Sequence, residues 1–287
     1  MVKFIVIAIS FLIALNKIFA EDSIIIQSTT STKNVGFYEY ILPYIYQDLG
    51  IKAKVVALGT GAAIRNAMNC DGDLLIAHSP LQEKKFIQRG FADKSYYFMH
   101  NSFIIIGPKS DPSKIRNKKT PENALKQIYY KKKRFISRGD NSGTHFKEQS
   151  IWKKLKLKPK SYSGDWYLET GTSMGATLNT AVGLGAYTLT DRASWITFKN
   201  KLDFEVMIKE GKNLENRYSA LAIKKNKCPF TKEKESRAII SWLISKKGKK
   251  IIQNFKKNGE QHFFVKSDWS FYKKLRIIIM ERAYKLK

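Results

Sequence analysis

The sequence predicts an α/β fold made of two lobes with a cleft between them. Short β-branched runs alternate with amphipathic stretches, a pattern typical of strands and helices in mainly parallel sheets. Two polar stretches, at residues 107–112 and 212–217, border apolar runs and are typical of crossing points between lobes. The chain has 287 residues, more than the roughly 100–200 of one domain, which predicts one large domain or two of medium size.

Residues 1–20 have the layout of a secretory signal peptide. A basic start at Lys3 is followed by an apolar run from Phe4 to Leu15, and Ala20 is a small residue suited to cleavage before Glu21. The run is shorter than the ~20 residues that a membrane-spanning helix needs; the alternative is an uncleaved anchor. No cysteine follows it, so we expect a periplasmic protein that is not a lipoprotein.

The expected elements follow in order along the chain. β-branched residues predict strands at residues 23–27, 54–58, 73–77, 102–107, 134–136 and 186–189. Helical spacing of apolar residues predicts helices at 35–49, 62–69, 82–89, 121–130, 144–154, 175–183, 192–199 and 234–255. The crossing points then give lobe one as 21–108 plus 214–287 and lobe two as 109–213. The basic and apolar stretch 269–287 is interpreted as an additional helix packed on the body, with a membrane-surface role as the alternative.

The chain is strongly basic, with 52 Lys+Arg against 24 Asp+Glu and a formal charge of +28. The lysines are scattered, and no zinc-finger, helix-turn-helix or RNA-binding motif accompanies them, so we expect no nucleic-acid partner. A positive field helps to attract a small anion, most strongly at low salt. We expect a monomer.

The chain has two cysteines, Cys70 and Cys228. In an oxidising compartment they can form one disulfide, but the sequence leaves open whether they lie close enough. Two isolated cysteines do not indicate a metal site, and no other His, Cys or carboxylate spacing does.

Four clusters of hydroxyl and glycine residues share one design, in which a strand ends and a helix begins. They lie at residues 28–32, 59–61, 137–144 and 170–175. A helix N-terminus has unpaired N–H groups and a partial positive charge, so it can bind an anion. Hydroxyl groups also cap helices, and plain capping is the alternative interpretation. Arg138 stands out because its guanidinium presents a planar fork of donors to an oxyanion, and Asp140 is placed to orient it.

Several motifs carry a specific resemblance. They are Ser28-Thr29-Thr30-Ser31-Thr32, Val56-Ala57-Leu58-Gly59-Thr60-Gly61, Ser137-Arg138-Gly139-Asp140-Asn141-Ser142-Gly143-Thr144-His145, Gly164-Asp165-Trp166-Tyr167-Leu168-Glu169-Thr170-Gly171, Met174-Gly175-Ala176-Thr177-Leu178-Asn179 and Ala186-Tyr187-Thr188-Leu189-Thr190-Asp191-Arg192. Over residues 23–265 the sequence resembles the tungstate-binding subunits of ABC transporters. It departs at Thr172-Ser173, where the family more often has glutamine and glycine, and at Ser79, where it more often has alanine.

The resemblance implies a class II periplasmic binding fold that closes on one oxyanion, tungstate or molybdate, and delivers it to an inner-membrane permease without a cofactor. Together with the second cluster, it makes the expected anion-binding residues Thr29, Thr30, Thr60, Arg138, Ser142, Gly143, Thr144, Thr172 and Ser173.

The segment around Arg138 is also similar to the Arg-Ser-Asp-x-Ser-Gly-Thr motif of phosphate-binding proteins, so phosphate and sulfate are rival ligands. A protonated phosphate needs a buried acceptor, whereas tungstate, molybdate and sulfate take donors only. Phosphate-binding proteins commonly place an aspartate after the third strand, where this chain has His78 and Ser79. A ligand that only accepts hydrogen bonds is therefore favoured, and His78 is either a donor near it or a packing residue.

Catalysis is not expected. Ser142, His145 and Asp191 are present, but Ser142 does not lie in a Gly-x-Ser-x-Gly elbow, no P-loop is present, and His145 is expected in the first helical turn after Ser142. A signalling receptor on the same fold is the remaining alternative.

Overall fold

The computed structural model describes residues 23–209, 211–257 and 259–265. The predicted signal peptide, 1–20, and the predicted helix within 269–287 lie outside the described residues. Within those described ranges, no helix has the length and apolar character needed to cross a membrane.

The strands of the main sheet are short except for β4 and β9. They are β1 (Ser23–Thr29), β2 (Lys52–Leu58), β3 (Leu74–Ala77), β4 (Tyr96–Pro108), β5 (Phe135–Ser137), β6 (Tyr167–Glu169), β7 (Tyr187–Asp191), β8 (Phe204–Ile208) and β9 (Glu215–Ala222). A small pair, β10 (Lys256–Lys257) and β11 (Glu260–Gln261), follows near the end.

The helices lie mostly between consecutive strands. They are α2 (Thr30–Asn34), α3 (Phe37–Leu49), α4 (Thr60–Met68), α5 (Pro80–Gln88), α6 (Pro121–Lys131), α7 (Gly143–Lys154), α8 (Met174–Gly183), α9 (Arg192–Thr197), α10 (Glu233–Ile244) and α11 (Lys246–Asn254). Two short 3-10 turns, η1 (Pro159–Tyr162) and η2 (Lys212–Leu214), complete the fold.

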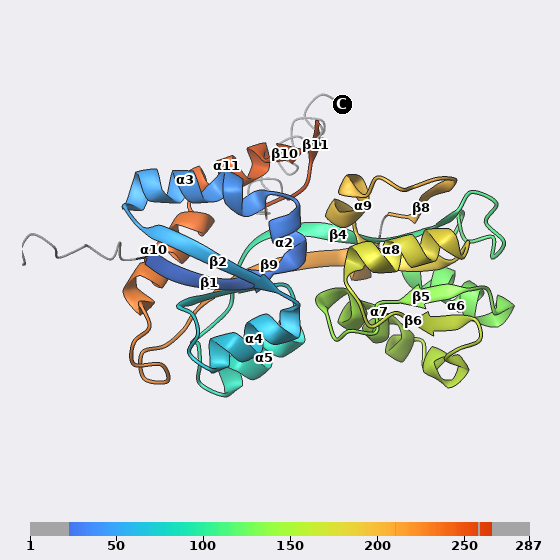
Figure 1. Cartoon of the computed structure of the whole chain (residues 1–287), viewed down its shortest axis with the longest axis horizontal. Coiled ribbons are helices and arrows are strands. Elements are labelled where there is room, and N and C mark those ends of the chain that lie inside the picture. Colours follow the sequence, from blue (N-terminus) through green and yellow to red (C-terminus); the bar gives the residue numbers. More distant parts are fainter. Residues whose placement is uncertain (1–22, 210, 258, 266–287) are drawn as a thin grey trace, which may run out of the picture.

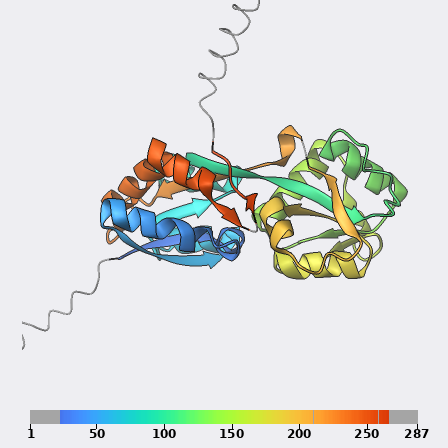
Figure 2. The same ribbon diagram turned by 90° about the horizontal axis from the view of Figure 1, so that it is seen from above.

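The sheet has two halves that share the long strand β4. The strand order is β2-β1-β3-β9-β4-β7-β5-β6, with β8 paired to β4. Up to Ser102, β4 pairs with β9, and from Phe103 it pairs with β7. We call β2, β1, β3, β9 and the start of β4 the first half, and the end of β4 with β5 to β8 the second half. Figures 1 and 2 show the two halves as separate groups, with β4 running through both.

The sheet is mixed, which corrects the expectation of mainly parallel sheets. β1 is parallel to β2 and β3, and β5 is parallel to β6 and β7. β9 is antiparallel to β3 and β4, and β4 is antiparallel to β7 and β8. Every antiparallel pair of the main sheet includes β4 or β9, and these two strands are antiparallel to each other. The sequence analysis did not predict β6, β8 or β9. Without β9, the antiparallel pairs that this strand forms with β3 and β4 could not be predicted.

Each half is covered on both faces by helices, as Figure 1 shows. Leu74 and Ile76 of β3 pack with α3 and α10, whereas Leu75 and Ala77 pack with α4 and α5. In the second half, Phe103 and Ile105 of β4 pack with α6 and α7, and the alternate residues pack with α8 and α9. This alternation follows from the two-residue period of a strand.

The predicted long helix at residues 234–255 is wrong, because the chain forms two helices there. Ser245 has an extended conformation (ψ 164°), and its side chain caps α11 by accepting a hydrogen bond from Gly248 N–H. A Cβ at Gly248 would lie 2.1 Å from the Trp242 carbonyl oxygen. The close approach of the two helices therefore requires glycine at this position.

Cys70 and Cys228 form a disulfide, which resolves the question that the sequence left open. Cys70 follows α4, Cys228 follows β9, and 158 positions separate them. The bond therefore ties the segment that follows β9 to the end of α4, within the first half of the sheet.

We expect the Cys70→Ser/Cys228→Ser double variant to unfold at lower denaturant concentration than the wild type. Closing so long a loop removes entropy from the unfolded chain and contributes about 4–5 kcal/mol. Chemical denaturation of both proteins, with and without reductant, measures the effect. Reductant should destabilise only the wild type, and equal midpoints for the two oxidised samples would contradict the prediction.

Candidate anion-binding site

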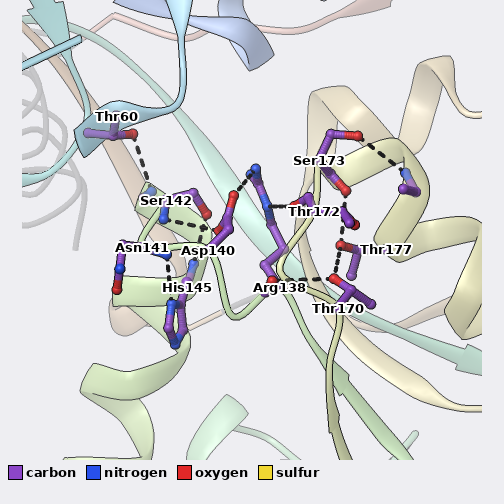
Figure 3. Close-up of polar contacts among 12 residues, drawn as sticks. Thr60, Arg138, Asp140, Asn141, Ser142, His145, Thr170, Thr172, Ser173 and Thr177 are labelled. Atoms are coloured by element: carbon purple, nitrogen blue, oxygen red, sulfur yellow. Dashed lines mark hydrogen bonds and ion pairs between the residues drawn. The ribbon is translucent and has the colours of Figure 1, made fainter. Parts of the chain in front are cut away.

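The loop after β5 holds Arg138 in place. The side chain is 9% exposed, its Nη2 lies 2.5 Å from Asp140 Oδ2, and its Nε donates to the Thr172 carbonyl oxygen at 3.3 Å (Figure 3). Burial lowers the pKa of Arg138, whereas the charges of Asp140 and Asp191 raise it. Because arginine stays protonated in proteins, the loop presents a fixed cation.

Asp140 orients the guanidinium, as the sequence predicted. Its Oδ2 contacts Arg138, and its Oδ1 accepts from Ser142 N–H at 3.1 Å. Both carboxylate oxygens therefore face donors of the protein. The tight turn between these residues uses left-handed backbone at Gly139 (φ 62°) and Asn141 (φ 58°), and a Cβ at Gly139 would lie 2.9 Å from Glu169 Cβ.

The loop ends in the first turn of α7. Ser142 caps this helix by accepting from His145 N–H, and Gly143 and Thr144 begin it. His145 lies in the first turn, as predicted, and its Nδ1 accepts from Asn141 N–H at 3.0 Å. Ser142, Gly143 and Thr144 are buried, and the N–H groups of this first turn have no partner within the helix backbone. Asp140 joins the turn to Arg138.

The two halves of the sheet meet at Gly143. Its N–H donates to Oγ1 of Thr60, the first residue of α4, at 3.2 Å (Figure 3). His78, which follows β3, lies against the same glycine: a Cβ there would be 2.5 Å from the His78 Cε1. The N-terminus of α4 in the first half therefore lies beside that of α7 in the second.

The remaining predicted residues lie at two other helix starts. Thr29 and Thr30 lie where β1 passes into α2, and the Thr29 hydroxyl bonds to Ser31 and Thr32. Thr172 and Ser173 are exposed before α8; Thr172 contributes its carbonyl to Arg138, and Ser173 caps the helix by accepting from Ala176 N–H. Hydrogen bonds, several of them through Asp140, join Thr60, Arg138, Ser142, Gly143 and Thr172 into one group. Thr29 bonds within its own turn instead.

Capping and anion binding are compatible at these positions. A hydroxyl group has one donor and two acceptor lone pairs. Ser142 and Ser173 use lone pairs to cap their helices, and Thr60 uses one to accept from Gly143. The hydroxyl hydrogens therefore remain able to donate to an anion.

A polar network that the sequence reasoning missed holds His78 in place. Its Nδ1 bonds to Asn216 Oδ1 at 2.8 Å, its ring stacks on Tyr218, and Asn216 donates to Asn101. Burial lowers the pKa of His78, which favours a neutral ring that donates through Nδ1. Asn216 belongs to the missed strand β9, where alternating burial from Asn216 to Tyr218 is the signal that identifies the strand.

α7 also carries a buried acid beneath the site. Glu148 Oε1 accepts from Tyr167 OH at 2.7 Å and from Trp152 Nε1 at 3.0 Å. Burial raises the pKa of Glu148 to about 7. Because the folded state binds this proton more tightly than the unfolded state, its stabilising contribution is complete below the unfolded pKa near 4.5 and is lost as the pH rises through about 7.

We therefore expect Glu148→Gln to unfold with less pH dependence than the wild type. Between about pH 5 and about pH 8 the wild type should lose about 3 kcal/mol relative to the variant. Urea denaturation at both pH values measures the difference. Glu39→Gln, at an exposed position on α3, is the control, and parallel pH profiles for the wild type and Glu148→Gln would refute the assignment.

The chain has close relatives of known class. Residues 20–247 match the family described as the PBP superfamily domain. The chain is 35% identical over 240 residues to the tungstate-binding protein TupA of Peptoclostridium acidaminophilum, with 83% of each sequence covered.

Two solved structures share the fold. The tungstate-binding protein TupA from Desulfovibrio alaskensis is 35% identical, with a TM-score of 0.77 and coverage of 86% of this chain and 99% of that one. The tungstate ABC transporter structure from Geobacter sulfurreducens is 37% identical, with a TM-score of 0.74 and coverage of 82% and 100%. The chain therefore belongs to the PBP superfamily and, within it, to the family of the tungstate-binding TupA proteins, which are solute-binding proteins rather than enzymes.

Proposed function

We propose that this protein captures tungstate, or the similar anion molybdate, in a cleft between two lobes. The lobes correspond to the two sheet halves, with residues 109–213 forming the second lobe. The observation that carries the proposal is the contact of two helix N-termini from different halves, through Thr60 and Gly143, beside the buried Arg138. Such a place supplies N–H donors and one fixed cation to a small anion.

The proposed contacts are donors from both sides of the cleft. Arg138, Ser142, Gly143 and Thr144 act from the second lobe and Thr29, Thr30 and Thr60 from the first, with Thr172 and Ser173 at the margin. Two helix N-termini stabilise a dianion through backbone groups that need no protonation change. The anion would replace Thr60 as the partner of Gly143 N–H, and the two lobes would close around it.

The choice among oxyanions depends on acceptors. Asp140 directs both carboxylate oxygens to Arg138 and Ser142, and Asp191 accepts from Ser194 N–H and Oγ. Both carboxylates are engaged with protein donors, so a protonated phosphate would lack a ready acceptor for its O–H. Fully deprotonated tungstate and molybdate lose nothing in such a site. The preference for tungstate follows the relatives named above.

We further propose that the protein works in the periplasm and passes its anion to the permease of an ABC transporter. Titration calorimetry of the mature, ligand-stripped protein with tungstate, molybdate, sulfate and phosphate in parallel tests the ligand. Tight tungstate binding with much weaker phosphate binding is expected. Preference for phosphate would mean that an acceptor faces the anion, and the proposal would then be wrong.

A further inference from the structure

Lys147 lies one turn after Gly143 on α7 and extends into a cavity between the two halves. Its Nζ lies 5.5 Å from the centroid of the Phe103 ring. The cavity has a volume of about 210 Å³ and is also lined by His78, Asn216, Glu215 and Arg217. A neighbouring cavity of about 290 Å³ shares His78 and Lys147 with it and reaches Gly143. Together they form a trough along α7 that is lined by His78 but not by Thr60.

The charges around the trough do not cancel. Glu215 accepts from Arg217 Nε at 2.9 Å and Nη2 at 2.7 Å, and also from Tyr97 OH at 3.2 Å. Its negative charge is therefore matched by Arg217. In the described part of the chain, no carboxylate oxygen lies within ion-pair distance of Lys147. His78 is favoured in its neutral form, so the cavity carries one positive charge in excess.

An ammonium group partly removed from water is stabilised by a counter-ion. Burial lowers the pKa of Lys147, and nearby Arg217 lowers it further, whereas Glu215 raises it. A small anion beside Nζ would accept up to three N–H bonds and offset the excess charge. The cavity volume is large enough for a sulfate-sized ion with water.

We propose that the Lys147 cavity is a second binding site for a small inorganic anion of the sulfate type, separate from the Arg138 site. Lys147 supplies the charged donors, and the Phe103 ring forms the apolar wall opposite. The site does not depend on the proposed function, because none of the proposed tungstate contacts lines the Lys147 cavity, although the neighbouring cavity reaches Gly143.

Crystals grown with tungstate and soaked in selenate test the site directly. Anomalous maps at the selenium and tungsten edges distinguish the two anions, so failure of tungstate to bind at Arg138 would leave the selenate result interpretable. We expect a selenate peak within hydrogen-bond distance of Lys147 Nζ in the wild type and in Lys147→Arg. Lys147→Met should lose the peak, whereas Lys126→Met, at an exposed lysine on α6 that lines neither cavity, should keep it.

Thermal unfolding with increasing sulfate, in tungstate-saturated protein, measures the affinity in solution. The sulfate concentration for half-maximal stabilisation should rise at least tenfold in Lys147→Met relative to Lys126→Met, because a charged hydrogen-bond donor is lost. Bulk salt effects are common to both variants and cancel in the comparison. A wild type without selenate at Lys147, or equal sulfate responses in the two variants, would overturn the proposal.

Discussion

Arg138→Ala should weaken tungstate binding by at least tenfold. The guanidinium is buried, held by Asp140 and the Thr172 carbonyl, and therefore presents its remaining donors without paying further ordering entropy on binding. A hydrogen bond to a charged group contributes about 1.5–3 kcal/mol, which corresponds to roughly ten- to over a hundredfold in affinity. Titration calorimetry of the stripped variant measures this loss.

Arg134→Ala is the matched control, because Arg134 is exposed immediately before β5. It removes the same charge from the net total and should leave the affinity almost unchanged at physiological salt. Comparable losses in the two variants would show that overall charge, rather than the position of Arg138, controls binding.

Gly143→Ala should also lower tungstate affinity by at least tenfold, through a steric effect. The new Cβ would lie 2.5 Å from His78 Cε1, and His78 is held by Asn216 and stacked on Tyr218. The ring cannot move without breaking these contacts, so the N-terminus of α7 must move away from α4. Donors displaced from a dianion lose hydrogen-bond geometry. Calorimetry on the folded variant provides the measurement.

A double variant identifies the cause. His78→Ala removes the ring that the new Cβ would meet, so Gly143→Ala/His78→Ala should bind more tightly than Gly143→Ala alone. Gly175→Ala, in the first turn of α8 with no atom within 4 Å of the added Cβ, is the control and should bind like the wild type. If the double variant gained no affinity, the His78 contact would not explain the loss.

Periodicity predicted the elements that alternate in the simple strand and helix order. Helices α4, α6, α7 and α8 begin within two residues of their predicted starts, because α4, α7 and α8 begin in the clusters of hydroxyl and glycine residues and Pro121 marks the start of α6. The return strand β9 was missed because its polar start, Glu215–Arg217, follows a polar stretch and resembles a loop. The break at Ser245 was missed because the apolar pattern continues across it, although the serine caps a new helix.

The site was predictable to the extent that it is local. Arg138, Asp140 and Ser142 lie within one loop, and their mutual bonds follow from short sequence separations. The contacts of Gly143 with Thr60 and His78 join residues that are distant in sequence and depend on how β4 and β9 connect the halves. No pattern along the chain predicts how these residues are placed relative to one another. The contact of Asn216 with His78 could be recognised only after β9 had been identified.

The most direct test of the central claim is an anomalous difference map at the tungsten edge from crystals of the protein with tungstate. We predict one strong peak between the N-termini of α4 and α7, within hydrogen-bond reach of Arg138 and Gly143 N–H. A strong peak elsewhere, with the place between Thr60, Arg138 and Gly143 empty, would contradict the proposed anion site.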